Sequence, residues 1–172
     1  MLSRTGIALS ALAVLLVANA GIWQKEEIIA HGQPIFVELA PVDPRSLMQG
    51  DFMRLNFRLP AEAIADRAPT WNGGNGGNGG LLSVERPRVI ARRDAKGVAT
   101  MLREDRGAAR AADELAIELT PKDGRWILVT DAWFFKEGEA KRWEAARYGE
   151  FRVDANGRAL LVGLRGPNLE AL

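Results

Sequence analysis

The longest apolar run of the chain lies close to its start. Residues 6–23 carry no charged side chain, and as a helix they would span roughly 27 Å, close to the thickness of a bilayer core. The residues that follow, up to Gly32, continue as a plausible helix that closes at this glycine. The pattern predicts an anchor segment, residues 1–32, in which residues 6–23 contact the lipid bilayer.

The charges that flank this run predict its orientation. Arg4 and the free amine precede it, whereas Lys25 and two glutamates follow it. The positive-inside tendency then places the N-terminus in the cytoplasm and the rest of the chain outside, with Trp23 at the membrane interface. A cleaved signal peptide is the alternative, because residues 18–20 read Ala-Asn-Ala, which fits a cleavage site. Both interpretations export the remainder of the chain.

Beyond position 32 the apolar residues mostly alternate, which predicts strands. The segments expected to form strands are 34–42, 52–57, 81–94, 98–103, 115–119, 125–135 and a hairpin over 150–164. Turn sequences separate several of them, at 94–97, 121–124 and 155–157. Good helix formers predict short helices over 59–68 and 137–149, and a Gly/Asn-rich loop covers 71–80. The predicted fold class is α+β, mainly β: an N-terminal transmembrane helix followed by a compact β-rich domain, residues 33–172, small-barrel or sandwich-like, with two short helices.

Composition narrows the chemistry. The 172 residues include 23 basic and 22 acidic side chains, a net charge of +1, without the one-sided charge of a nucleic-acid-binding protein. There is no cysteine, and His31 is the only histidine. This composition excludes disulfides, thiolate metal sites and a histidine-rich metal site. We therefore expect no nucleic-acid partner, no cofactor and no metal.

The segment "PVDPRSLMQGDFMRLNF", residues 41–57, combines a turn with a strand. Asp43 and Pro44 are a turn-opening pair, and Gly50 can adopt a backbone angle that other residues resist. Asp51 can then accept hydrogen bonds from turn amides or pair with Arg45 or Arg54. Along the strand, one face carries Met53, Leu55 and Phe57, and the other carries Phe52, Arg54 and Asn56.

This segment resembles the defining motif of the GDYxxLxY family, small membrane-anchored bacterial proteins of uncharacterised function. The matching positions are Gly50, Asp51, Phe52, Leu55 and Phe57, with phenylalanine in place of tyrosine at 52 and 57. The preceding residues and the C-terminal "FFKEGEAKRWEAARYGEFRV" are also similar to the family. The resemblance implies a bacterial inner-membrane protein with a periplasmic domain. It supplies no catalytic residue, and a packing role for the two aromatic positions survives the loss of the hydroxyl groups.

The first functional hypothesis is a non-enzymatic envelope module. The anchor would hold the β-rich domain at the membrane, where it binds a partner or has a structural role, and an integral membrane protein is the expected partner. Exposed aromatic residues could form the contact surface, although for each one taken singly a place in the core is the stronger expectation. The candidates are Trp71, Trp126, Trp133, Phe134 and Trp143.

Two enzymatic alternatives stay open. In a serine–lysine hydrolase resembling signal peptidases, Ser46 would be the nucleophile and a desolvated lysine its base. The lysines considered for this role are Lys96, Lys122, Lys136 and Lys141. In a carboxylate-pair enzyme, Asp43 and Asp51 would converge across the turn. Both aspartates also have structural roles in the turn, so we assign no catalytic residue.

Overall fold

The computed structural model describes residues 4–40, 52–60 and 86–172. Several predictions lie outside these residues: the turn over 43–51, most of the helix over 59–68 and the loop over 71–80. Leu59 and Pro60, the first residues of that predicted helix, are described and are not helical.

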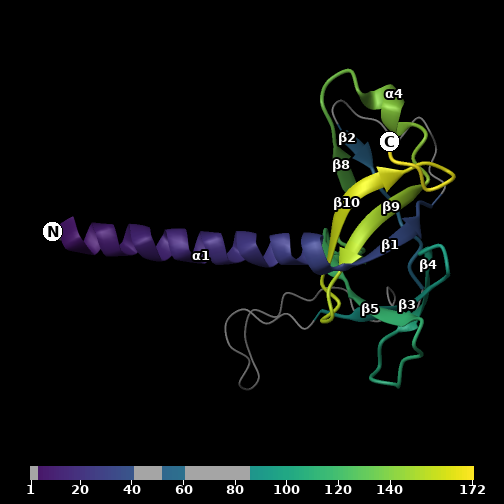
Figure 1. Ribbon diagram of the computed structural model, residues 1–172, viewed down its shortest axis with the longest axis horizontal. Helices are drawn as coiled ribbons and strands as arrows, with labels where there is room; N and C mark the ends of the chain where they lie inside the picture. Colours follow the sequence, from purple (N-terminus) through teal and green to yellow (C-terminus); the bar gives the residue numbers. More distant parts are fainter. Residues whose placement is uncertain (1–3, 41–51, 61–85) are drawn as a thin grey trace.

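Four small antiparallel sheets and two helices make up the described part of the chain (Figure 1). The helices are α1 (Arg4–His31) and α4 (Ala140–Trp143). The strands are β1 (Gln33–Glu38), β2 (Phe52–Arg54), β3 (Arg88–Arg93), β4 (Ala99–Glu104), β5 (Glu114–Glu118), β6 (Thr120–Lys122), β7 (Arg125–Ile127), β8 (Ala132–Phe134), β9 (Tyr148–Val153) and β10 (Ala159–Arg165). The sheets have the orders β1-β9-β10, β2-β8, β4-β3-β5 and β6-β7. The predicted mainly-β class is confirmed, and no closed barrel forms among these strands.

Helix α1 projects from the β-rich region as one straight rod (Figure 1). Its apolar side chains from Ile7 to Trp23 are exposed, and nothing else in the described chain covers them. The helix is long and apolar enough to cross a membrane by length and composition. Ile28 is its buried apolar side chain, so the helix meets the core only in its last turns.

The join between α1 and β1 consists of one residue, Gly32. Its amide donates to the carbonyl of Ile28 (2.8 Å), which closes the helix, and β1 begins at the next position. A Cβ atom here would collide with that carbonyl oxygen and lie 3.2 Å from the backbone nitrogen of Val153 in β9. The predicted helix end is therefore confirmed, but the glycine is required by close backbone packing.

The sheet β1-β9-β10 supplies the central part of the core. Ile35 and Val37 of β1 alternate inward as predicted, opposite Phe151 and Gly149 of the central strand β9. Their cluster continues into every other sheet, because Met53, Val89 and Trp126 belong to it as well. One core therefore holds four sheets that are each too small to be stable alone.

A bulge interrupts the regular alternation of β10. A simple alternation places Leu160, Val162 and Leu164 together, but the pairing with β9 shifts between Leu161 and Gly163. Before the shift Leu161 packs on the core, and after it Leu164 is buried. Because of the extra residue, odd-numbered positions face the core before the bulge and even-numbered positions after it. A regular alternation does not predict this change.

Two hairpins share the same turn. The segments Asp-Ala-Lys-Gly and Asp-Ala-Asn-Gly join β3 to β4 and β9 to β10. In each, one aspartate oxygen accepts two backbone amides, from Lys96 and Val98 onto Asp94 and from Asn156 and Arg158 onto Asp154 (2.8–2.9 Å). Burial works to raise the pKa of Asp154, but the Arg158 guanidinium and these amides outweigh it and lower that pKa.

These turns fasten the two three-stranded sheets to each other. The carbonyl of Gly97 accepts the amide of Phe36 on β1 (2.9 Å), and the carbonyl of Gly157 accepts the amide of Glu118 on β5 (2.8 Å). Each hairpin turn therefore caps the outer strand of the other sheet. Both glycines have positive φ, and a Cβ at Gly157 would lie 2.9 Å from the carbonyl oxygen of Ala116.

The predicted single strand over 125–135 is wrong. It divides into β7 and β8, because the amide of Thr130 donates to the carbonyl of Leu128 (2.6 Å) in a three-residue turn. Val129, at the centre of this turn, has a φ of 60°, an unusual and strained conformation for a β-branched residue. A run of aromatic and β-branched residues favours an extended chain, so the pattern conceals the turn.

Two further boundaries differ from the prediction. The helix expected over 137–149 is only α4, since Gly138 precedes it with a φ of 85° and Tyr148 already belongs to β9. The turn expected over 121–124 is a two-residue hairpin connection, Asp123–Gly124, with positive φ at both positions. Pro121 and Lys122 are part of β6.

We predict that Gly32→Ala destabilises the β-rich region by roughly 1–3 kcal/mol, because backbone atoms of Ile28 and Val153 leave no room for the methyl group. The measurement is thermal unfolding of the full-length protein in detergent. Gly21→Ala, at a helical position with open space around it, is the matched control and should melt like the parent. Equal melting temperatures for both variants would contradict the close packing of the join.

Candidate functional site

Residues 52–57, which we call the motif strand, link two sheets. Its first half is β2, in which Phe52 lies opposite Phe134 and Met53 opposite Trp133 of β8. The amide of Leu55 then donates to the carbonyl of Asp131 (2.7 Å). Its second half leaves β8 and reaches the end of β1, where Phe57 forms a bridge with Leu39 and the carbonyl of Asn56 accepts the amide of Ala40 (2.8 Å). The motif thus connects β8 to β1.

The predicted inward face of this strand is confirmed. Met53, Leu55 and Phe57 are buried, and the ring of Phe57 meets that of Phe151 edge-on with centroids 5.3 Å apart. Gly149 makes room for both rings, since a Cβ there would lie 2.9 Å from Phe151 and 3.1 Å from Phe57. Leu55 and Phe57 therefore act as core residues.

The outward face carries an aromatic pair that covers the β2–β8 ribbon. Phe52 is half-buried, and its ring centroid lies 5.7 Å from that of Phe134. Phe134 is 75% exposed and is the one exposed large hydrophobic side chain of the β-rich region described here. We call Phe52 and Phe134 the aromatic patch.

The other aromatic candidates are mostly core. Trp126 and Trp143 are buried, Trp133 is half-buried, and Trp71 lies outside the described residues. Trp133 and Trp143 meet edge-on with centroids 5.5 Å apart, and Arg142 lies over the Trp143 ring (4.8 Å). Of the candidates in the described chain, only Phe134 offers most of its ring to a partner.

Five of the predicted motif residues lie outside the described part of the chain. They are Asp43, Pro44, Arg45, Gly50 and Asp51. Their proposed roles in a turn, and the carboxylate-pair alternative, therefore stay predictions. The structure brings together the remaining three, Phe52, Leu55 and Phe57, on one strand but on two different faces.

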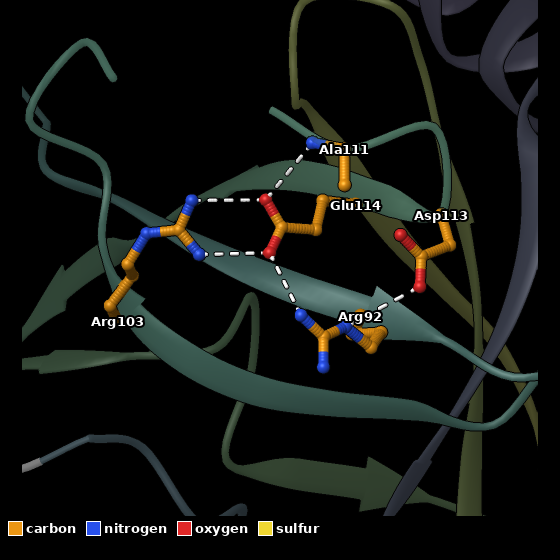
Figure 2. A network of polar contacts seen from close by, with 5 residues as sticks. All are labelled: Arg92, Arg103, Ala111, Asp113 and Glu114. Atoms are coloured by element: carbon orange, nitrogen blue, oxygen red, sulfur yellow. Dashed lines mark hydrogen bonds and ion pairs between the residues drawn. The ribbon is translucent and has the colours of Figure 1, made fainter. Parts of the chain in front are cut away.

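A network of ion pairs that the sequence did not indicate spans the sheet β4-β3-β5 (Figure 2). Both terminal guanidinium nitrogens of Arg103 on β4 donate to the carboxylate of Glu114 on β5, each at 2.9 Å. Arg92 on the central strand reaches the same carboxylate at 3.4 Å, and the amide of Ala111 donates to it at 3.2 Å. Glu114 thus ties all three strands together. No spacing in the sequence marks these pairs, because the sheet brings them together from distant positions.

This environment determines the protonation of Glu114. The hydrogen bonds from Arg103 outweigh the burial of the carboxyl group and, with the Ala111 amide and the charge of Arg92, lower its pKa to about 2. A carboxylate that stays ionised and is already hydrogen-bonded on both oxygens is unsuited to donate a proton near neutral pH. The network is structural.

A second buried carboxylate, that of Glu150, is also paired with two arginines. Glu150 on β9 accepts hydrogen bonds from Arg165 on β10 (2.7 Å) and lies 3.6 Å from a guanidinium nitrogen of Arg152. The Arg165 guanidinium also lies over the ring of Phe36, 6.0 Å from its centroid. This pair secures β9 to β10 on the face opposite Phe151, so it too has a structural explanation.

The lysines named for hydrolase chemistry occupy solvated positions. Lys96, Lys122, Lys136 and Lys141 are all exposed, and Lys122 pairs with Asp131. A lysine that activates a serine must be desolvated, and none of these four is. Ser46 lies outside the described residues, and no observation favours the hydrolase. Within the described chain no three His, Cys, Asp or Glu side chains are grouped to hold a metal ion.

The features described so far define a β-rich chain led by one apolar helix of membrane-spanning length, with the strand of a sequence motif packed on its core. A profile of the GDYXXLXY protein family matches residues 14–164, most of the chain. The chain belongs to the GDYXXLXY family. A search of curated proteins and a search of solved structures each found no match.

We predict that the two aromatic positions of the motif differ in energetic weight. Phe57→Ala should lower the free energy of unfolding by about 3–5 kcal/mol, as expected for a ring removed from a packed core. Phe52→Ala should lower it by about 1 kcal/mol, the usual weight of an exposed aromatic pair. Denaturant unfolding of the full-length protein measures both. Equal losses would show that the two faces of the strand are not as described.

The low pKa of Glu114 predicts a pH-dependent stability. The folded-state pKa of about 2 lies below the ordinary 4.5, so the network stabilises the fold fully above pH 4.5. The stabilisation is lost as the pH falls toward 2. The difference in unfolding free energy between the parent and Glu114→Gln should therefore shrink over this range.

A series of denaturant titrations from pH 7 to pH 2.5 measures that difference. Asp113→Asn is the control, because Asp113 pairs with the same Arg92 at 3.4 Å but both side chains are about half exposed (52% and 55%). It should have little effect at neutral pH. A Glu114→Gln deficit that is the same at pH 7 and pH 3 would contradict the assignment.

Proposed function

We propose that this protein is a single-pass membrane-anchored envelope protein with a non-enzymatic binding or structural role, and that its partner is an integral membrane protein. The division into an anchor, residues 1–32, and an exported β-rich domain, residues 33–172, belongs to this proposal. So do the bacterial inner membrane as its location, a cytoplasmic N-terminus and a periplasmic domain.

The observation that carries the proposal is the bare apolar surface of α1. Its side chains from Ile7 to Trp23 have no cover from the described chain, although large apolar surfaces of this kind are seldom left in water. Lipid, or another apolar helix within lipid, is the environment that removes this cost. Arg4, just before the run, supports the cytoplasmic N-terminus.

The non-enzymatic role is supported by what the described polar groups do. The two buried carboxylates, Glu114 and Glu150, are held by arginines across strands, and the four lysines considered as bases are exposed. We also propose that Asp51 is structural and binds turn amides or an arginine. Asp51→Ala would then lower thermal stability, whereas a catalytic Asp51 would leave melting unchanged.

The aromatic patch is the surface we assign to the partner. Exposed aromatic side chains bury a large area at little conformational cost and are enriched at the centres of protein interfaces. Phe134 lies on β8 and its ring contacts that of Phe52, so part of its contact surface is in place before a partner binds. Such preorganisation lowers the entropic cost of binding.

We predict that the detergent-solubilised full-length protein retains one stoichiometric integral membrane protein on affinity purification, identified by mass spectrometry. Phe134→Ala should lose this partner while the free energy of unfolding falls by only about 1 kcal/mol, the weight of its ring contact with Phe52, because the side chain is 75% exposed. Lys136→Ala, also exposed and two residues further on, is the matched control and should retain the partner. Release of the parent protein from membranes by alkaline carbonate would contradict the anchor. Retention of the partner by Phe134→Ala would contradict the patch.

A further inference from the structure

We propose that a hollow between the base of α1 and strand β10 holds the phosphate headgroup of an anionic membrane phospholipid. This inference rests on the proposed membrane anchor and adds a ligand to it. The hollow has a volume of about 320 Å³, roughly ten water molecules, enough for a glycerophosphate group. Its apolar lining comes from Gly21 and Ile28 of the helix and from Val129 and Leu160.

The depth of the hollow matches the membrane interface. The helical residues on its wall run from Gly21 to Ile28, a rise of about 10 Å that includes the level of Trp23. Tryptophan at the end of an apolar span lies among the headgroups. The helix continues directly through Gly32 into β1, so the hollow is fixed at this level.

The charges around the hollow favour an anion. Lys25, Arg86 and Arg158 line it, against one carboxylate, Glu118. Arg86 is paired with Glu118 (3.0 Å), and Arg158 with Asp154 (2.7 Å). Within the described chain Lys25 has no acidic partner, which leaves one uncompensated positive charge beside two arginines that retain free N–H groups. A phosphate can accept hydrogen bonds from all three cations.

A neighbouring hollow on the same helix provides a contrast. Its volume is about 530 Å³, and its lining includes Glu27 and Asp154 with Arg158 and His31. Glu27 and Asp154 repel an anion there, and His31 is already 3.0 Å from Glu27. Of the two hollows, the one lined by Lys25 and Arg86 is the site for a phosphate.

The test uses the full-length protein in nanodiscs of equal phosphatidylglycerol and phosphatidylcholine. After release into mild detergent, native mass spectrometry counts the lipids that remain bound. The parent should retain phosphatidylglycerol in preference to phosphatidylcholine. Lys25→Gln, an exposed position where folding is not at stake, should reduce this preference about fivefold, the usual weight of one basic residue at an anionic surface. Arg86→Gln should reduce it as well, and the exposed Lys141→Gln on α4 should not.

Each outcome decides. Equal retention of the two lipids by the parent, or an unchanged preference in Lys25→Gln, overturns the assignment. Competition of the bound lipid by millimolar inorganic phosphate overturns the choice of a lipid as the source of the phosphate. Flotation of the full-length protein with vesicles of the same two lipids reports the anchor separately: a parent protein that floats but shows no lipid preference in the retention assay refutes only the hollow. A parent protein that does not float refutes the proposed function itself.

Discussion

The packing of Gly32 against β9 controls how the whole molecule is placed. A helix that leaves a domain through a flexible linker conveys no orientation, but here the last helical carbonyl, one glycine and the first residue of an edge strand follow without a gap. A Cβ atom on this glycine would lie 3.2 Å from the backbone nitrogen of Val153, and the neighbouring Ile28 is buried. The axis of α1 is therefore fixed relative to the sheet β1-β9-β10. The apolar span of the helix is therefore also held at a set distance from Arg86 and Arg158, which line the hollow beside Lys25.

The sheets of the β-rich region are small: in the described chain there are four, and none has more than three strands. Sheets this small expose edges and bury little on their own. The two Asp-Ala-x-Gly turns cover part of these edges. The Gly97 carbonyl hydrogen-bonds to β1 and the Gly157 carbonyl to β5, so each three-stranded sheet contributes a turn to the edge of the other. The motif strand then joins β1 to β8. The single core is the result of these cross-connections, with every sheet supplying residues to it.

How far the sequence predicts this structure depends on the range of the interactions involved. The helix, the strand β1, and the hairpins at Asp94 and Asp154 depend on neighbours within a few residues, and all were predicted. The turn at Val129 was not, because its residues favour extended structure, whereas the bend is held by the hydrogen bond from Thr130 to Leu128 and by the packing of Leu128 and Trp126 on the core. The bulge in β10 reverses an alternation that is otherwise regular. The Glu114 network depends on strand register, which a single sequence does not supply.

The position of the family motif indicates what family membership means physically. Leu55 and Phe57 are core residues, and the backbone of the same strand joins two sheets, so these positions report the architecture. At Phe57 the ring packs against Phe151 over Gly149, a role that needs a flat apolar group and no hydroxyl. Phenylalanine therefore satisfies a position where the family pattern has tyrosine. Among the described motif residues, only Phe52 lies partly at the surface. Its ring contacts that of Phe134, which is not part of the motif. Functional differences between members of such a family should arise at exposed positions of this kind and at the residues that line the hollow beside α1, since Leu55 and Phe57 of the motif are occupied in the core.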